Sequence, residues 1–77
     1  MRRCLEIGDI IERAAGGKPT RGLVVSNERD GLYIMSTTGW HMAIPSTHVR
    51  ILSAEDGDVY EETKRKSERH WKRFLKG

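Results

Sequence analysis

The chain has 77 residues, 14 of them Lys or Arg and 11 Asp or Glu, so its formal net charge is +3. This length fits one small domain and leaves no room for a large buried active site, because a core of this size supplies only ~3–5 kcal/mol of net stability. There is no run of about 18 apolar residues that could span a membrane, and no signal peptide is expected. The single cysteine, Cys4, cannot form an internal disulfide, so we expect a cytoplasmic protein.

Residues 1–52 are rich in Ile, Val, Leu and Gly and carry turn signals every few residues, which is typical of short strands. In chain order, we expect strands at residues 9–13, 21–27, 32–36, 40–44 and 49–52. Their expected connections are a Gly- and Pro-containing loop at 14–20, tight turns at 28–31 and 37–39, and a 3₁₀ turn at 45–48.

The alternation of apolar residues in these strands predicts a single core, because side chains two apart in a strand point to the same face. The side chains expected to line it are Leu32, Ile34, Trp40, Met42, Ile44, Val49 and Ile51. Tyr33 and His41 are expected on the outer face. Five short antiparallel strands must curl to hide their edges, so we expect a mainly β protein with a small five-stranded, partly open barrel.

A resemblance to a known family supports the barrel. Residues 39–52 resemble the end of an SH3 domain, where a strand runs through a Pro-containing 3₁₀ turn into a last strand. Gly8-Asp9 and the segment 21–25 resemble the strand starts of bacterial SH3-like barrels of the KOW class. The resemblance covers residues 7–52 and implies a barrel that binds nucleic acid, peptides or proteins. His48 stands where peptide-binding SH3 domains have a Tyr, and the loop 14–20 lacks their aromatic and acidic residues, so proline-rich peptides are not expected ligands.

Residues 53–77 predict a C-terminal amphipathic helix, packed on or extending from the barrel of residues 1–52 within one domain. Ser53 and Asp56 have the spacing of a capping box, but Gly57 favours a helix start at Asp58. The apolar side of the helical wheel carries Tyr60, Ser67, Trp71, Phe74 and Leu75, interrupted by Lys64. The opposite side carries Arg65, Arg69, Lys72 and Lys76, with Lys66 and Arg73 beside them. Glu61–Arg65, Glu62–Lys66 and Glu68–Lys72 are candidate ion pairs at i,i+4 spacing.

No constellation for catalysis emerges from the sequence. His41 and His48 are seven residues apart with no cysteine near them, which does not fit a zinc site. Gly16-Gly17-Lys18 lacks the spacing of a phosphate-binding loop, and the acidic residues near 55–62 are expected in solvent. We therefore expect no catalytic residue, metal, cofactor or small-molecule substrate, and the chain is not expected to be an enzyme.

Two binding functions fit these observations. The first is a nucleic-acid-associated regulator of the transcription or translation type, whose cations contact phosphates without sequence specificity and whose Tyr33 stacks on a base. Its site would comprise Lys18, Arg21, Tyr33, Arg65, Arg69, Lys72, Arg73 and Lys76, with Arg29 as a further loop cation.

The second is a protein-binding module, such as a small phage-like regulator or inhibitor that docks on a larger host protein. Its site would comprise Trp40, Pro45, His48, Trp71 and Phe74. The sequence leaves open whether Trp71 and Phe74 pack on the barrel or contact a partner. Binding to a membrane surface is not expected, because the apolar face of the helix is short and interrupted.

Charge is strongly segregated along the chain. Residues 1–54 carry 7 bases and 5 acids, residues 55–62 carry 5 acids and no base, and residues 63–77 carry 7 bases and 1 acid. A nearly neutral barrel is thus followed by an acidic segment of charge −5 and a basic segment of charge +6. This segregation moves the expected binding surface to the last fifteen residues, where the acidic segment would mask part of the charge.

Overall fold

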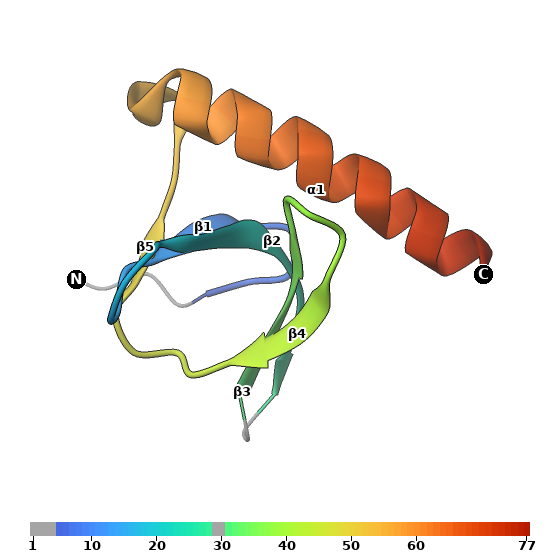
Figure 1. Cartoon of the computed structure of the whole chain (residues 1–77), viewed down its shortest axis with the longest axis horizontal. Coiled ribbons are helices and arrows are strands. Elements are labelled where there is room, and N and C mark those ends of the chain that lie inside the picture. The colour runs from blue at the N-terminus through green and yellow to red at the C-terminus, as the bar shows by residue number, and fades with distance from the viewer. Residues whose placement is uncertain (1–4, 29–30) are drawn as a thin grey trace.

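The computed structural model describes residues 5–28 and 31–77. Its elements, in chain order, are β1 (Ile10–Arg13), β2 (Thr20–Glu28), β3 (Gly31–Ser36), β4 (His41–Ile44), β5 (Val49–Ile51), the 3₁₀ turn η1 (Ala54–Asp56) and α1 (Asp58–Lys76). The strands form one antiparallel sheet in the order β4-β3-β2-β1-β5, and α1 lies across one face of it (Figure 1). The expected mainly β fold with a C-terminal helix is confirmed. The sheet is not closed, because β4 and β5 are its two edges and do not pair with each other.

All five expected strands are present, and every bound agrees with the prediction within one residue. The longest strand, β2, contains an irregularity that alternation did not predict: Val24 pairs with Ile34, but Ser26 pairs with Tyr33. The extra residue on the β2 side is a bulge, which bends a strand and increases its twist. The bend lets β2 follow the curl of the sheet, as its curved ribbon shows in Figure 1.

The sheet has an apolar layer on each face. The layer on its concave side consists of Ile11, Val24, Leu32, Ile34 and Ile44, with Leu5, Val49 and Ile51 packed against it. The layer under α1 consists of Ile10, Leu23 and Leu52, with Val25, Tyr60 and Trp71 packed against it. Neighbouring residues of a strand point to opposite faces, so adjacent apolar residues in β1 and β2 serve both layers.

Two residues assigned to the single predicted core are exposed instead. Trp40 keeps 71% of its surface exposed and Met42 37%. Trp40 precedes the first residue of β4, and β4 is an edge strand, so both side chains lie at the open rim of the curled sheet. The prediction that they line the core is wrong because alternation gives the face of a side chain but not whether that face is covered.

The segment 45–48 is not the 3₁₀ turn that was expected. It is a hydrogen-bonded turn in which His48 adopts a left-handed backbone with φ of 61°. The end of β1 holds this turn, since Arg13 Nε donates to the Thr47 carbonyl at 3.0 Å and the Ala14 N–H donates to the His48 carbonyl at 3.4 Å. Contacts from β1, which is distant in sequence, therefore help to hold this turn.

The predicted start of the helix at Asp58 is confirmed. The capping residues Ser53 and Asp56 cap the preceding 3₁₀ turn η1 and not α1. The Ser53 N–H donates to Asp56 Oδ2 at 2.8 Å, which closes the carboxylate arm of a capping box around η1. Gly57, with φ of 63°, then separates η1 from α1, which begins at Asp58.

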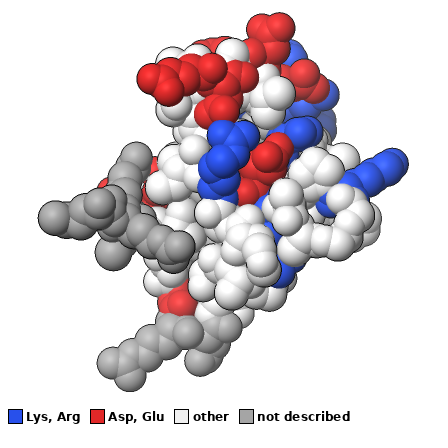
Figure 2. All heavy atoms as spheres, turned by 90° about the vertical axis from the view of Figure 1, so that its left-hand side faces the viewer, with Lys and Arg blue, Asp and Glu red and all other residues white. Residues whose placement is uncertain are grey.

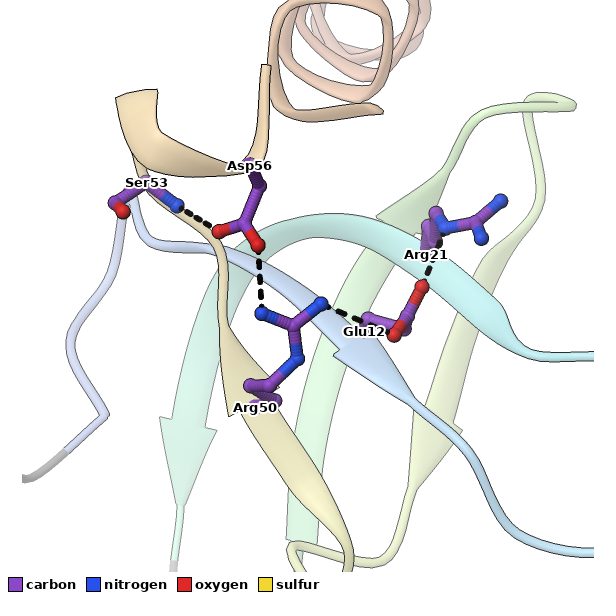
Figure 3. A network of polar contacts seen from close by, with 5 residues as sticks. All are labelled: Glu12, Arg21, Arg50, Ser53 and Asp56. Atoms are coloured by element: carbon purple, nitrogen blue, oxygen red, sulfur yellow. Dashed lines mark hydrogen bonds and ion pairs between the residues drawn. The ribbon is translucent and has the colours of Figure 1, made fainter. Parts of the chain in front are cut away.

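A charged network fixes η1 to the sheet (Figure 3). Arg50 donates to Asp56 Oδ1 at 2.7 Å and lies 3.4 Å from Glu12 Oε1, while Arg21 Nε donates to the other oxygen of Glu12 at 2.7 Å. The hydrogen bond from Arg50, together with that from the Ser53 N–H, holds the pKa of Asp56 below its ordinary value of 3.8. The same contact raises the pKa of Arg50.

The Asp56→Asn variant tests this network through its pH dependence. A carboxyl group whose pKa is lower in the folded state stabilises that state above its unfolded pKa, and the contribution is lost as the pH falls through the folded pKa. We therefore expect the variant to melt at a slightly lower temperature than wild type at pH 7, with the difference vanishing well below pH 3.8. Thermal melts at pH 7 and pH 2.5 measure this; an equal difference at both values would contradict it. The effect is small because the ion pair lies at the surface, with Arg50 exposed and Asp56 partly exposed, and added salt should reduce it further.

The residues of α1 that are buried are small and polar. Thr63 is 2% exposed and Ser67 is fully buried. Helical spacing predicted Ser67 on the apolar side of the helix, but the burial of Thr63 was not predicted. Among the described residues, Ser67 Oγ is the one buried side-chain oxygen or nitrogen without a hydrogen-bond partner.

The Ser67→Ala variant is expected to be more stable than wild type by about 1 kcal/mol, because it removes an unsatisfied buried hydroxyl and Ala favours the helix. Urea denaturation followed by circular dichroism measures the change. The matched control is Ser46→Ala, in the exposed turn after β4, which is expected to be neutral. A loss of stability in Ser67→Ala would contradict the burial of a free hydroxyl.

Candidate nucleic-acid interface

The helix α1 carries opposite charges on its two ends. Its first turn contains Asp58 and Glu61 and its last turn Arg73 and Lys76, an arrangement that complements the helix dipole. Figure 2, viewed from the side of the helix start, shows the carboxylates gathered at the top of the molecule over η1 and the first turns of α1. Of the three expected i,i+4 pairs, Glu62–Lys66 forms at 2.6 Å, and this bond lowers the pKa of Glu62.

Most cations in residues 65–76 of α1 face solvent. The exposed ones in the predicted site are Arg65, Arg69, Lys72, Arg73 and Lys76. In the described part of the chain, no carboxylate lies within 4 Å of any of these five side chains. They extend over residues 65–76 of the helix, about 16 Å from first to last, which is long enough to contact several consecutive phosphates.

Two of the predicted cations of the sheet, Lys18 and Arg21, lie in the part of the chain that the structure describes. Lys18 is exposed in the loop between β1 and β2. Arg21 is held by Glu12 at 2.7 Å within the network of Figure 3, so its charge is already matched. Arg29 and Cys4 lie outside the described residues, as does part of the turn predicted at 28–31.

An aromatic cluster forms where the C-terminal half of α1 meets β3 and β4. Its members are Tyr33, His41, Trp71 and Phe74. The rings of Trp71 and Phe74 stack with centroids 5.1 Å apart and planes 12° apart. His41 lies 5.0 Å from Phe74 in an edge arrangement, 5.8 Å from Trp71 and 5.9 Å from Tyr33.

The sequence left open whether Trp71 and Phe74 pack on the sheet, and the structure answers this differently for each residue. Trp71 is half-buried and packs on the apolar layer under α1, whereas Phe74 remains 50% exposed. Tyr33 lies on the outer face as expected. His41 is also on that face, but it contacts the helix and is not an isolated surface residue. The i,i+3 spacing of Trp71 and Phe74 was a signal for the stacked pair; nothing local pointed to His41.

The β3–β4 turn supports this corner of the molecule. Ser36 Oγ accepts hydrogen bonds from the Thr38 and Trp40 N–H groups at 3.3 and 3.1 Å. Gly39 has φ of +94°, and a Cβ added to it would lie 3.1 Å from the His70 ring. The turn therefore fits closely under α1 and fixes where β4 starts.

The residues predicted for protein binding do not form one groove. Trp40 and Pro45 lie at opposite ends of β4, about 16 Å apart along an extended strand. Trp40 instead borders an open hollow of about 250 Å³ together with Met42, Pro19 and Thr37. His48 is exposed in the turn beyond Pro45.

The described residues form neither a metal cluster nor a membrane span. Within residues 5–28 and 31–77, no three His, Cys, Asp or Glu side chains gather closely enough to hold a metal ion. In the same part of the chain, no helix combines the length and the apolar character needed to cross a membrane.

Comparisons with protein-family models, with curated proteins and with solved structures give no match to this chain. The SH3-like resemblance and the function that it implies therefore remain predictions.

Proposed function

We propose that this chain is a non-enzymatic binding module that contacts nucleic acid through residues 65–76 of α1. The observation that carries the proposal is the set of five exposed cations defined above, which have no carboxylate within 4 Å among the described residues. Intrachain ion pairs neutralise other cations of the chain, such as Arg21, Arg50 and Lys66. Phosphates are the ligand that would neutralise a row of unmatched cations, and such contacts give affinity without sequence specificity.

The fold is part of the proposal. A curled five-stranded antiparallel sheet in the order β4-β3-β2-β1-β5 is compatible with an SH3-like barrel of the KOW class. In this view the sheet is a platform that holds α1, and the helix supplies the charge. A reducing, cytoplasmic location fits the single cysteine.

A salt titration of binding tests the proposal. The purified chain is added to fluorescently labelled oligonucleotides, single-stranded and duplex, and the anisotropy is followed from about 20 to 300 mM salt. If all five cations contact phosphates of a single strand, the slope of log K against log salt is about −3.5, since each contact contributes about −0.7. A slope near zero, or no binding to any probe at 20 mM salt, would refute the proposal.

The second candidate function is docking on a protein. It is favoured by Trp40, which is 71% exposed beside the hollow that Met42 also lines. Aromatic side chains of this kind are typical anchors of protein interfaces. Affinity purification with and without nuclease separates the two functions: a single protein partner that persists after nuclease treatment and is lost in Trp40→Ala favours docking on a protein.

A further inference from the structure

Part of the backbone of β4 points away from the sheet. Among the described strands β4 pairs with β3 alone, since β5 is the opposite edge of the sheet (Figure 1). Backbone groups of an antiparallel strand point alternately towards one neighbour and the other. The Ser36 N–H donates to the Trp40 carbonyl at 2.9 Å just before β4, so the next residue that faces β3 is Met42. The N–H and C=O groups of His41 and Ala43 therefore point outward.

The strand β4 also lacks the features that protect free edges from pairing with another chain. Such edges usually carry charged side chains, Pro or a bulge, or are very short. The other edge, β5, is of this kind, with three residues and the charged Arg50 at its centre. By contrast, β4 has the sequence His-Met-Ala-Ile, pairs with β3 without a bulge, and exposes its first three side chains. An edge strand of this composition is expected to pair with another strand.

Apolar side chains flank this edge on both faces of the sheet. Alternation places Trp40 and Met42 on the concave side with the buried Ile44, and they are 71% and 37% exposed. On the α1 side, the His41 ring meets the Phe74 ring edge-on with centroids 5.0 Å apart, and Phe74 is 50% exposed. A strand added to β4 would therefore bury apolar surface as well as form backbone hydrogen bonds.

We infer that β4 pairs with β4 of a second copy of this chain, in an antiparallel register centred on Met42. A twofold axis through this register places Met42 opposite Met42 of the second copy and His41 opposite its Ala43. Both His41 and Ala43 present outward N–H and C=O groups, so each His41–Ala43 pair exchanges two hydrogen bonds. One such contact closes a dimer, because the axis brings the same edge of both copies together.

This edge is complementary to itself. In the same register Trp40 lies opposite Ile44 of the second copy, so apolar side chains meet apolar ones on the concave side. No charged side chain of β4 is brought against another, because the strand contains no Lys, Arg, Asp or Glu. The contact is smaller than the roughly 800 Å² per partner that stable dimers bury, because only β4 and Trp40 contribute, so we expect a weak dimer.

Sedimentation equilibrium of the full chain, without nucleic acid, tests the inference. We expect the mean mass to rise from 8.8 kDa towards twice this value between about 20 µM and about 1 mM, as for a weak dimer. Each copy has a net charge of +3, so added salt should strengthen the association. Association that weakens with salt would overturn the inference. A constant mass of 8.8 kDa would also overturn it and leave a strand of another protein as the partner of β4.

The Met42→Lys variant locates the contact. It is expected to raise the dissociation constant of the dimer at least about tenfold, because two like charges would lie directly opposite each other across the axis. The matched control is Val59→Lys, since Val59 is apolar, 38% exposed and lies in the first turn of α1, away from β4 (Figure 1). Thermal melts establish that both variants are folded. Equal weakening of the dimer in both would overturn the inference.

Amide hydrogen exchange measured by NMR identifies the paired groups without any substitution. The His41 and Ala43 amides should exchange about two- to fivefold more slowly at about 1 mM than at about 20 µM, as the monomer fraction falls. The Met42 amide faces β3 in both states and should not change. A dimer in which the His41 and Ala43 amides do not slow would overturn the inference. Since no nucleic acid is present, none of these results bears on the proposed function.

Discussion

Replacing both Arg69 and Arg73 with Glu is expected to abolish nucleic-acid binding, with a loss of at least about a hundredfold in affinity at 50 mM salt. Both side chains are exposed on α1 and have no carboxylate within 4 Å among the described residues. The double variant removes two phosphate contacts and adds two charges that repel phosphate. Anisotropy titrations with the labelled probes measure the loss, and the salt slope should fall by about 1.4 units, at 0.7 for each lost contact with a single strand.

Two further variants separate a local effect from that of net charge. Arg69→Gln with Arg73→Gln lowers the net charge by two, and so does Ala14→Glu with Ser46→Glu. Ala14 and Ser46 are exposed at or near the turn between β4 and β5, far from the C-terminus of α1 (Figure 1). We expect Arg69→Gln with Arg73→Gln to weaken binding at least tenfold. We expect Ala14→Glu with Ser46→Glu to weaken it at most threefold. Equal losses would show that binding depends on overall charge and not on this surface.

The Arg69→Glu/Arg73→Glu variant also places two acids near the C-terminal end of α1. There they oppose the helix dipole and lower the stability of the fold by about 0.3–1 kcal/mol each. Circular dichroism at the assay temperature therefore accompanies every titration. Arg69→Gln with Arg73→Gln avoids this loss of stability. It therefore keeps the prediction testable if Arg69→Glu with Arg73→Glu is poorly folded.

Gly22→Ala is expected to lower the free energy of unfolding by about 3 kcal/mol, which is most of the net stability of the fold. A Cβ at this position would lie 2.5 Å from the carbonyl oxygen of Met35 and 3.1 Å from the side chain of Ile34. Gly22 pairs with Ser36 in the middle of the sheet, and the obstructing atom belongs to the backbone, which cannot rotate away. Overpacking costs 1–3 kcal/mol or more, against a net stability of ~3–5 kcal/mol for a domain of this size.

Urea denaturation followed by circular dichroism measures this loss. The matched control is Gly16→Asn, in the loop between β1 and β2, where φ is +60° and no atom lies within 4 Å of an added Cβ. Asn tolerates this left-handed conformation, so the control should change stability by less than about 1 kcal/mol. A Gly22→Ala variant as stable as the control would contradict the close pairing of β2 with β3.

Local patterns predicted the elements of the fold. Alternation in β3 placed Leu32 and Ile34 in the core, and both are fully buried. Gly57 ended η1 and set the start of α1 at Asp58, because a left-handed residue interrupts a helix wherever it occurs. The exposed cations of α1 followed from helical spacing alone, since their positions depend on the period of the helix and not on the rest of the chain.

Contacts between distant segments decided the rest. Trp40 and Met42 had the same alternation as Ile44, but they lie at a rim that no described segment covers. Arg21 became an internal ion-pair partner because β1 places Glu12 opposite it, a pairing that is set by sheet register. The sequence by itself thus determined which segments form strands and helix and where the positive charge gathers, since these depend on neighbours within a few residues. Only the tertiary structure decided which cations stay unmatched and that His41 joins Trp71 and Phe74, because each depends on how α1 docks on the sheet.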